Sequence, residues 1–320
     1  MSTIQDLFQQ AQLAEAAYAN FLDPLKTKLQ ALEDNGFSPT QATDFLTQWE
    51  VVDQFTADGF IVGDNSGFSA TLFRNKINGQ YNFAVRGSQD PVADFMWADS
   101  SLATGGIAID QLISMVNYVL RLDVGATGQT AQLYVDTPPL WPAFGTRTVV
   151  WSGAMVQGVG PNIPLSSLTN LTLTGHSLGG ALAQMYQRIF GGTGVNTFNS
   201  VGIGNPNSPI FDQLATMLGL PSGSFSSGTG DNLVVSGEIA STLPGTVMGN
   251  PQIQVFSETE NTNIVSAHRM PYLTDSLALY NLFAQLDPSL NLGIVERFMG
   301  FTYGDTTAND EWFDERKKAA

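Results

Sequence analysis

The sequence predicts an α/β fold, in which a mostly parallel central sheet carries helices on both faces. Residues 170–176 form a β-branched and leucine-rich run that is typical of a buried strand, and an Ala/Leu/Met-rich helical pattern follows directly over 178–190. A β-hairpin pattern precedes this unit, between residues 67 and 88. The 320 residues contain no segment typical of a linker, so we expect a single domain over residues 1–320.

Helical patterns flank the hairpin. Residues 4–21 place apolar side chains at helical spacing and predict an amphipathic helix. A second helix is expected to begin at Ser38, because Pro39 suits the first helical position and Gln41 can complete a capping box. After the hairpin, residues 109–120 carry one apolar stripe that is typical of a helix facing the core.

The hairpin is predicted from the dipeptide Asn78-Gly79, which lies between two apolar runs and is typical of a type I′ turn. Its second strand ends at Arg86-Gly87-Ser88. Gly87 would permit a close turn, after which Ser88 could donate its N–H and its hydroxyl to a ligand. The alternative is an ordinary hairpin end with a surface arginine.

The most informative segment is the turn between the strand at 170–176 and its helix. Gly175-His176-Ser177-Leu178-Gly179 has the G-x-S-x-G pattern of a nucleophile elbow. Glycines on both sides let the chain fold back sharply and leave the serine in a strained conformation. The helix N-terminus then directs free N–H groups to the place where an oxyanion would form, and Leu178 would supply one of them. The pattern predicts Ser177 as a nucleophile, with a structural turn as the alternative.

A serine hydroxyl needs a base, which is nearly always histidine. The chain has only two histidines. His176 lies inside the elbow, and its side chain is expected to point away from the Ser177 hydroxyl and to serve in packing or hydrogen bonding. His268 follows the serine, as the chain order serine, acid, histidine requires. We therefore expect His268 to be the general base.

The third member should be a carboxylate between Ser177 and His268. Asp231 and Glu238 flank a strand pattern at 232–237. Catalytic groups gather at the carboxyl ends of strands in open α/β sheets, which favours Glu238 over Asp231. Both remain open, with a solvated loop carboxylate as the alternative for each; Asp212 lies in an expected helix and is a poorer candidate.

The composition excludes several classes of function. The chain carries 13 Lys and Arg against 29 Asp and Glu, a net charge of −16, which disfavours nucleic acids and electrostatic docking on anionic membranes. Without cysteine there are no disulfides, cysteine nucleophiles or thiolate metal sites. With only two histidines, one of them assigned as the base, a zinc site is not expected. The chemistry of a serine, a histidine and an acid implies neither a metal nor a cofactor.

No apolar run reaches transmembrane length, and no signal-peptide pattern opens the chain. The missing Sec signal suggests the cytoplasm. A lysine-poor, cysteine-free composition rich in Gly, Ser, Thr and Asn suggests a bacterial protein exported by another route. We favour export without a Sec signal, with the cytoplasm as the alternative.

These motifs together resemble the class 3 lipases of the α/β-hydrolase superfamily, in their bacterial branch. The resemblance extends over roughly residues 65–120 and 170–285. It rests on four segments, at residues 67–74, 83–88, 174–183 and 197–206.

The resemblance implies an α/β-hydrolase fold with lid or cap insertions. It assigns the nucleophile to Ser177, the base to His268 and the oxyanion donors to Ser88 and Leu178. In the family the acid stands about six residues before a Leu-Pro pair, as Glu238 does here, but the family residue is usually aspartate.

Two segments are expected to cover the site. Residues 89–108 follow the proposed oxyanion turn, where lipases of this family carry their lid. Residues 122–165 are poor in charge and too apolar for disorder. We interpret them as an acyl-pocket wall or second flap, with a strand-containing insertion packed on the core as the alternative.

The sequence thus predicts a serine carboxylic ester hydrolase, a lipase or esterase that cleaves neutral lipid or other acyl esters through an acyl-enzyme and touches a lipid interface only transiently. A phospholipase A1 or a peptidase would use the same residues. A feruloyl-type esterase would need aromatic contacts, which Trp97 or Trp141 could supply. A non-enzymatic α/β-hydrolase-like binding protein is the alternative from another class, but it would need none of the three catalytic groups.

Overall fold

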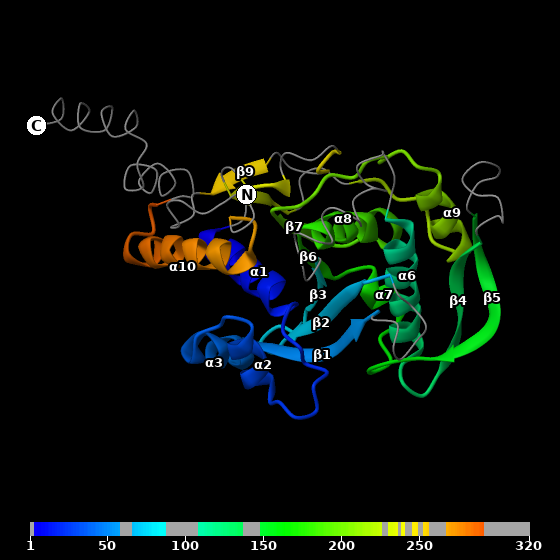
Figure 1. Ribbon diagram of the computed structural model, residues 1–320, viewed down its shortest axis with the longest axis horizontal. Helices are drawn as coiled ribbons and strands as arrows, with labels where there is room; N and C mark the ends of the chain where they lie inside the picture. The colour runs from blue at the N-terminus through cyan, green and yellow to red at the C-terminus, as the bar shows by residue number, and fades with distance from the viewer. Residues whose placement is uncertain are drawn as a thin grey trace, which may run out of the picture.

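Seven strands form the central sheet, in the order β1-β2-β3-β6-β7-β8-β9 (Figure 1). The computed structural model describes residues 3–57, 66–87, 108–136, 148–225, 230–235, 238–240, 245–248, 252–255 and 267–290. The first three strands pair antiparallel, and every pairing from β3 onward is parallel. The strands are β1 (Trp49–Thr56), β2 (Ser69–Asn75), β3 (Tyr81–Arg86), β6 (Thr172–His176), β7 (Gly194–Phe198), β8 (Asn232–Val235) and β9 (Gln252–Val255).

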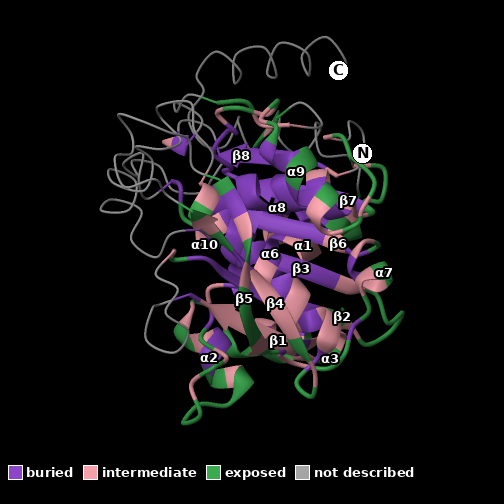
Figure 2. Cartoon of the chain, turned by 90° about the vertical axis from the view of Figure 1, so that its right-hand side faces the viewer, coloured by how far each residue is buried: buried purple, intermediate pink, exposed green. Residues whose placement is uncertain are grey.

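Helices cover both faces of this sheet, as predicted. Strands β3, β6, β7 and β8 together with α8 form the buried centre of the protein (Figure 2). On one face α6 and α8 pack against β2 and β3; on the other, α1 and α10 pack against β7, β8 and β9. The helices are α1 (Ile4–Ala16), α2 (Lys28–Asp34), α3 (Pro39–Gln48), α6 (Ile109–Val124), α7 (Leu165–Leu168), α8 (Leu178–Phe190), α9 (Ile210–Met217) and α10 (Met270–Leu286). Within the described residues, none of these helices combines the length and the apolar character needed to cross a membrane.

The N-terminal helix is shorter than its sequence pattern predicts. It ends at Ala16 rather than near residue 21, because the next turn tightens into bonds between residues three apart. There the Tyr18 N–H donates to the Glu15 carbonyl at 3.0 Å and the Ala19 N–H to that of Ala16 at 3.1 Å. The prediction for α3 is confirmed, since its Ser38 N-cap forms the expected capping box with Gln41.

The hairpin of β2 and β3 is confirmed, but its predicted type I′ turn is wrong. Residues 76–80 lie between the two strands, and the Asn75 N–H donates to the Gln80 carbonyl at 2.8 Å. A type I′ turn needs positive φ at both central residues, whereas only Gly79 has one, at 73°. The Asn75 side chain organises the loop instead, since its Oδ1 accepts the N–H groups of Ile77 at 2.9 Å and Asn78 at 3.2 Å.

The segment at residues 122–165 contains a second, two-stranded antiparallel sheet, made of β4 (Gln129–Asp136) and β5 (Thr148–Gln157). It packs on α6 through Leu133, whose backbone N–H and carbonyl both bond the Asn117 side chain, at 2.7 and 2.8 Å. The described part of this segment is therefore a pair of antiparallel strands attached to α6, and residues 137–147 between them lie outside the described residues. The predicted lid at 89–108 lies outside the described residues except for Ala108.

A buried carboxylate lies where α1 meets α10, which crosses in front of α1 in Figure 1. Glu15 is only 5% exposed and hydrogen-bonds Thr274 of α10. Burial raises the pKa of Glu15 to about 8, and the neighbouring charge of Asp275 adds to the rise, while the Thr274 bond opposes it. Glu15 is therefore protonated in the native state at neutral pH.

We expect Glu15→Gln to stabilise the protein increasingly as the pH rises. The pKa of Glu15 in the folded state, about 8, lies above the ordinary value of 4.5. Between pH 4.5 and 8 the native state therefore keeps a proton that the unfolded state has released, and the stability of the parent falls as the pH rises. Thermal unfolding should show nearly equal Tm values for variant and parent at pH 4.5 and a Tm several degrees higher for the variant at pH 8. Asp44→Asn, at an exposed position of α3, is the control; a Glu15→Gln effect independent of pH would contradict the argument.

Candidate active site

Ser177 occupies the sharp turn between β6 and α8. Its backbone has φ 57° and ψ −130°, and it is one of only two described non-glycine residues with positive φ. Such a conformation costs roughly 1–3 kcal/mol and persists only where the surroundings hold it. Here the Ser177 N–H donates to the Phe198 carbonyl at 3.0 Å, and the Ser177 carbonyl accepts the Gly180 N–H at 3.0 Å. This is the geometry of a nucleophile elbow.

The elbow glycines are explained by close backbone approach. A Cβ on Gly175 would overlap the carbonyl of Gly179, and a Cβ on Gly179 would overlap the carbonyl of Val85 in β3. A Cβ on Gly180 would lie 2.5 Å from the Ser200 Oγ. Helix α8 can therefore begin immediately after β6 and pack on β3 only if these positions carry no side chain.

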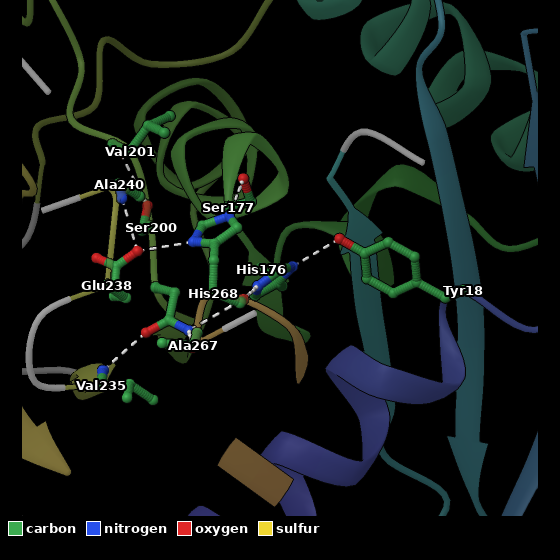
Figure 3. Close-up of polar contacts among 11 residues, drawn as sticks. Tyr18, His176, Ser177, Ser200, Val201, Val235, Glu238, Ala240, Ala267 and His268 are labelled. Atoms are coloured by element: carbon green, nitrogen blue, oxygen red, sulfur yellow. Dashed lines mark hydrogen bonds and ion pairs between the residues drawn. The ribbon is translucent and has the colours of Figure 1, made fainter. Parts of the chain in front are cut away.

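The structure brings three predicted residues into one hydrogen-bonded chain (Figure 3). The His268 Nε2 lies 2.8 Å from the Ser177 Oγ, and its Nδ1 lies 2.7 Å from the Glu238 Oε2. Because a carboxylate accepts, Nδ1–H donates to Glu238, which leaves Nε2 free to accept the Ser177 proton. All three side chains are buried, Glu238 completely.

These groups meet because parallel strands end at the same edge of the sheet. Ser177 follows β6 and Glu238 follows β8, whereas Asp231 precedes β8. Asp231 is held at the start of that strand, where its backbone carbonyl accepts the Thr197 N–H at 3.0 Å. The geometry thus places Glu238, and not Asp231, beside His268. Sheet order and elbow together make this an α/β-hydrolase fold.

The oxyanion donors proposed from the sequence are only partly described. Leu178 is the first residue of α8, adjacent to Ser177, and N–H groups in the first turn of a helix lack intrahelical acceptors. Ser88 lies outside the described residues. Gly87, just before it, donates its N–H to the Tyr18 hydroxyl at 3.0 Å. No cluster of His, Cys, Asp or Glu able to hold a metal ion occurs among the described residues.

His176 is a buried hydrogen-bonding residue, as predicted. Its ring nitrogens lie 2.6 Å from the Tyr18 hydroxyl and 2.6 Å from the His268 carbonyl oxygen. Burial lowers the pKa of His176 well below its usual range, and the neighbouring His268 lowers it further, while the bond to the His268 carbonyl opposes the shift. His176 is therefore neutral, and both of its ring nitrogens are already hydrogen-bonded, to Tyr18 and to the His268 carbonyl. Of the two histidines in the sequence, this leaves His268 available to Ser177.

Asn199, which the sequence analysis missed, ties the acid side of the site to the histidine. Its Nδ2 donates to the His268 carbonyl at 3.1 Å, and its Oδ1 accepts the Val235 N–H at 2.8 Å from the end of β8. Its φ of 46° is one that asparagine tolerates better than most residues. An asparagine directly after a buried strand was the only signal in the sequence, and it is a weak one.

No family model matches the sequence, and no curated protein matches it. Similar solved structures include the lipase of Rhizopus microsporus var. chinensis, with 14% identity, 81% of this chain and 76% of that chain covered, and a TM-score of 0.38. The Lip2 lipase of Yarrowia lipolytica has 16% identity, coverage of 79% and 78%, and a TM-score of 0.38. A Rhizomucor miehei lipase propeptide complex has 15% identity, coverage of 79% and 67%, and a TM-score of 0.38. These three structures are fungal and do not place the chain in a bacterial branch.

We expect Gly87→Ala to disturb the elbow. A Cβ at Gly87 would lie 2.7 Å from the His176 carbonyl oxygen and 2.8 Å from the Ser177 Cβ, so these atoms must move. Overpacking of this kind costs about 1–3 kcal/mol. Thermal unfolding should show a lower Tm, and an organophosphonate should label Ser177 more slowly. Gly153→Ala in β5 is the matched control, because a Cβ at Gly153 would have no heavy atom within 4 Å; equal behaviour of the two variants would refute this expectation.

Proposed function

We propose that this protein is a serine carboxylic ester hydrolase of the lipase or esterase type. The observation that carries the proposal is the buried chain from the Ser177 Oγ through His268 to Glu238, with contacts of 2.8 and 2.7 Å. A strained serine at a helix N-terminus, a base within hydrogen-bond reach and a carboxylate that orients the base are the parts that acyl transfer requires.

The reaction proceeds in two halves. The Ser177 Oγ attacks the carbonyl carbon of the ester while the His268 Nε2 takes the hydroxyl proton. The tetrahedral intermediate then collapses, the bond to the alcohol breaks, and His268 gives its proton to the departing alkoxide. Water attacks the acyl-enzyme with His268 again as base, the carboxylic acid leaves, and the Ser177 hydroxyl is restored.

Glu238 keeps the imidazole ready for both halves. Its bond to Nδ1–H fixes the tautomer in which Nε2 accepts a proton, and its charge stabilises the imidazolium that forms. The Ala240 N–H, 2.6 Å from the Glu238 Oε2, helps to satisfy the buried carboxylate. The oxyanion would be bound by the Leu178 N–H and the Ser88 N–H and hydroxyl, with the dipole of α8 favouring negative charge there.

We propose neutral acyl esters, such as glycerides, as the substrate class. A net charge of −16 repels anionic lipid surfaces and leaves uncharged ester substrates favoured. A phospholipase A1 would share the catalytic chain and differ in accepting anionic phospholipids. A non-enzymatic binding protein would have no use for a base and a buried acid aligned on one serine.

A panel of p-nitrophenyl esters from short to long acyl chains tests the proposal. The parent protein should hydrolyse members of the panel, and Ser177→Ala should lower kcat by roughly 10⁴-fold or more, because the nucleophile is lost while the fold is kept. An organophosphonate should label the parent at Ser177 in a one-to-one ratio, as read by mass spectrometry.

The same preparation should be compared on tributyrin emulsion and on phosphatidylglycerol vesicles at low and high salt. Faster cleavage of the anionic vesicles would favour the phospholipase alternative. Full activity of Ser177→Ala, or labelling at another serine, would remove the support for a serine hydrolase and favour the binding protein.

We also expect Glu238→Gln to reduce kcat far more than Asp231→Asn. The glutamine cannot stabilise the imidazolium as a carboxylate does, and losses of about 10²–10⁴-fold are typical of an orienting acid. Asp231 is a matched control because it is also buried, at the other end of β8. Circular dichroism should verify that both variants fold; a severe loss in Asp231→Asn with a mild one in Glu238→Gln would overturn the assignment of the acid.

A further inference from the structure

A second hydrogen-bonded chain meets His268, and the reaction described above does not use it; Figure 3 shows its part from Tyr18 through His176 to His268. It begins at the Gly87 N–H, passes through the Tyr18 hydroxyl and the His176 ring, and ends at the backbone carbonyl of His268. Its three contacts measure 3.0, 2.6 and 2.6 Å. Tyr18 lies just after α1, 158 residues from His176 in the sequence.

Each bond in this chain has only one possible direction. The His268 carbonyl can only accept, so the His176 Nε2 carries a proton and donates it. A neutral imidazole then has an unprotonated Nδ1, to which the Tyr18 hydroxyl donates. The Tyr18 oxygen in turn accepts the Gly87 N–H. The low pKa of His176 agrees with this arrangement, because a second ring proton would compete with the hydroxyl for the same contact.

This second hydrogen-bonded chain connects parts of the site that must stay at fixed distances from one another. Gly87 directly precedes Ser88, the proposed second oxyanion donor, and His176 directly precedes the nucleophile. His268 lies in a turn just before α10 rather than within a helix or strand, so side-chain bonds hold its main chain. Its carbonyl receives two of them, one from His176 and one from Asn199.

We propose that Tyr18 and His176 are positioning residues, which set the place of the His268 ring and of the Gly87 turn relative to Ser177. The inference rests on the proposed ester hydrolase function. Neither residue touches the reacting atoms, so substrate binding should not depend on them. Their loss should lower kcat and leave KM nearly unchanged, since small displacements of a base or an oxyanion donor are costly to the chemical step.

The test compares Tyr18→Phe with Tyr186→Phe. Each variant removes one hydrogen-bonded tyrosine hydroxyl. The Tyr186 hydroxyl donates to the Leu168 carbonyl at 2.8 Å, away from the Ser177–His268–Glu238 chain. On p-nitrophenyl butyrate, Tyr18→Phe should lower kcat about 10- to 100-fold with little change in KM. Tyr186→Phe should lower the Tm, because it too loses a hydrogen bond, but it should keep the kcat of the parent.

A conservative exchange at His176 gives a second and independent test. In His176→Gln the side-chain amide can still reach the His268 carbonyl and donate to it, whereas in His176→Leu no donor remains. The glutamine variant should therefore retain clearly more of the parent kcat than the leucine variant. If Tyr18→Phe does not fold, this comparison alone tests the positioning role.

Proton NMR reports on His268 directly, because the chain has only two histidines. The low-field signal of the His268 Nδ1–H in its bond to Glu238 should shift or broaden in Tyr18→Phe and remain in place in Tyr186→Phe. Equal kcat in the parent and Tyr18→Phe, or equal losses in both tyrosine variants, would overturn the positioning role. If the parent hydrolyses no ester, the proposed function fails by itself, and an unchanged Nδ1–H signal in Tyr18→Phe would then refute the inference separately.

Discussion

Backbone contact at the elbow is the constraint from which the rest of the site follows. Only Ser177 separates the end of β6 from the start of α8, and the first turn of α8 lies so close to β3 that a side chain at Gly179 would overlap the Val85 carbonyl. The chain can turn this sharply only with Ser177 at positive φ. The same strain leaves the serine hydroxyl at the carboxyl edge of the sheet, where β8 and the turn before α10 deliver Glu238 and His268.

Burial of the proposed catalytic groups is costly, and the surrounding hydrogen bonds show how this cost is offset. A fully buried carboxylate is unfavourable unless its oxygens find donors. Glu238 receives the His268 Nδ1–H and the Ala240 N–H on one oxygen. His268 is held in turn at both ring nitrogens and at its carbonyl. With so many hydrogen bonds already in place, little reorganisation would remain for the proposed reaction.

The parts of the site that the sequence predicts are those coded by local patterns. Ser177 follows from the glycine spacing, His268 from the chain order, and Glu238 from the direction of β8. The prediction of a type I′ turn at Asn78-Gly79 was wrong because the Asn75 side chain, which lies outside this dipeptide, determines the conformation of the loop. Tyr18 and Asn199 were missed because their bonds join residues 158 and 69 positions apart, a distance over which no sequence period extends.

The end of α1 links the packing of the helices to the geometry of the site. Glu15 and Tyr18 lie one turn apart, and the Tyr18 N–H donates to the Glu15 carbonyl at 3.0 Å. One side chain faces Thr274 of α10, while the other faces His176. Helix α10 begins two residues after His268, so the packing of α1 on α10 supports the histidine turn, and Tyr18 holds the same turn through His176. The tightened turn after Ala16 is what directs Tyr18 to His176, so the early end of α1 is itself part of the construction of the site.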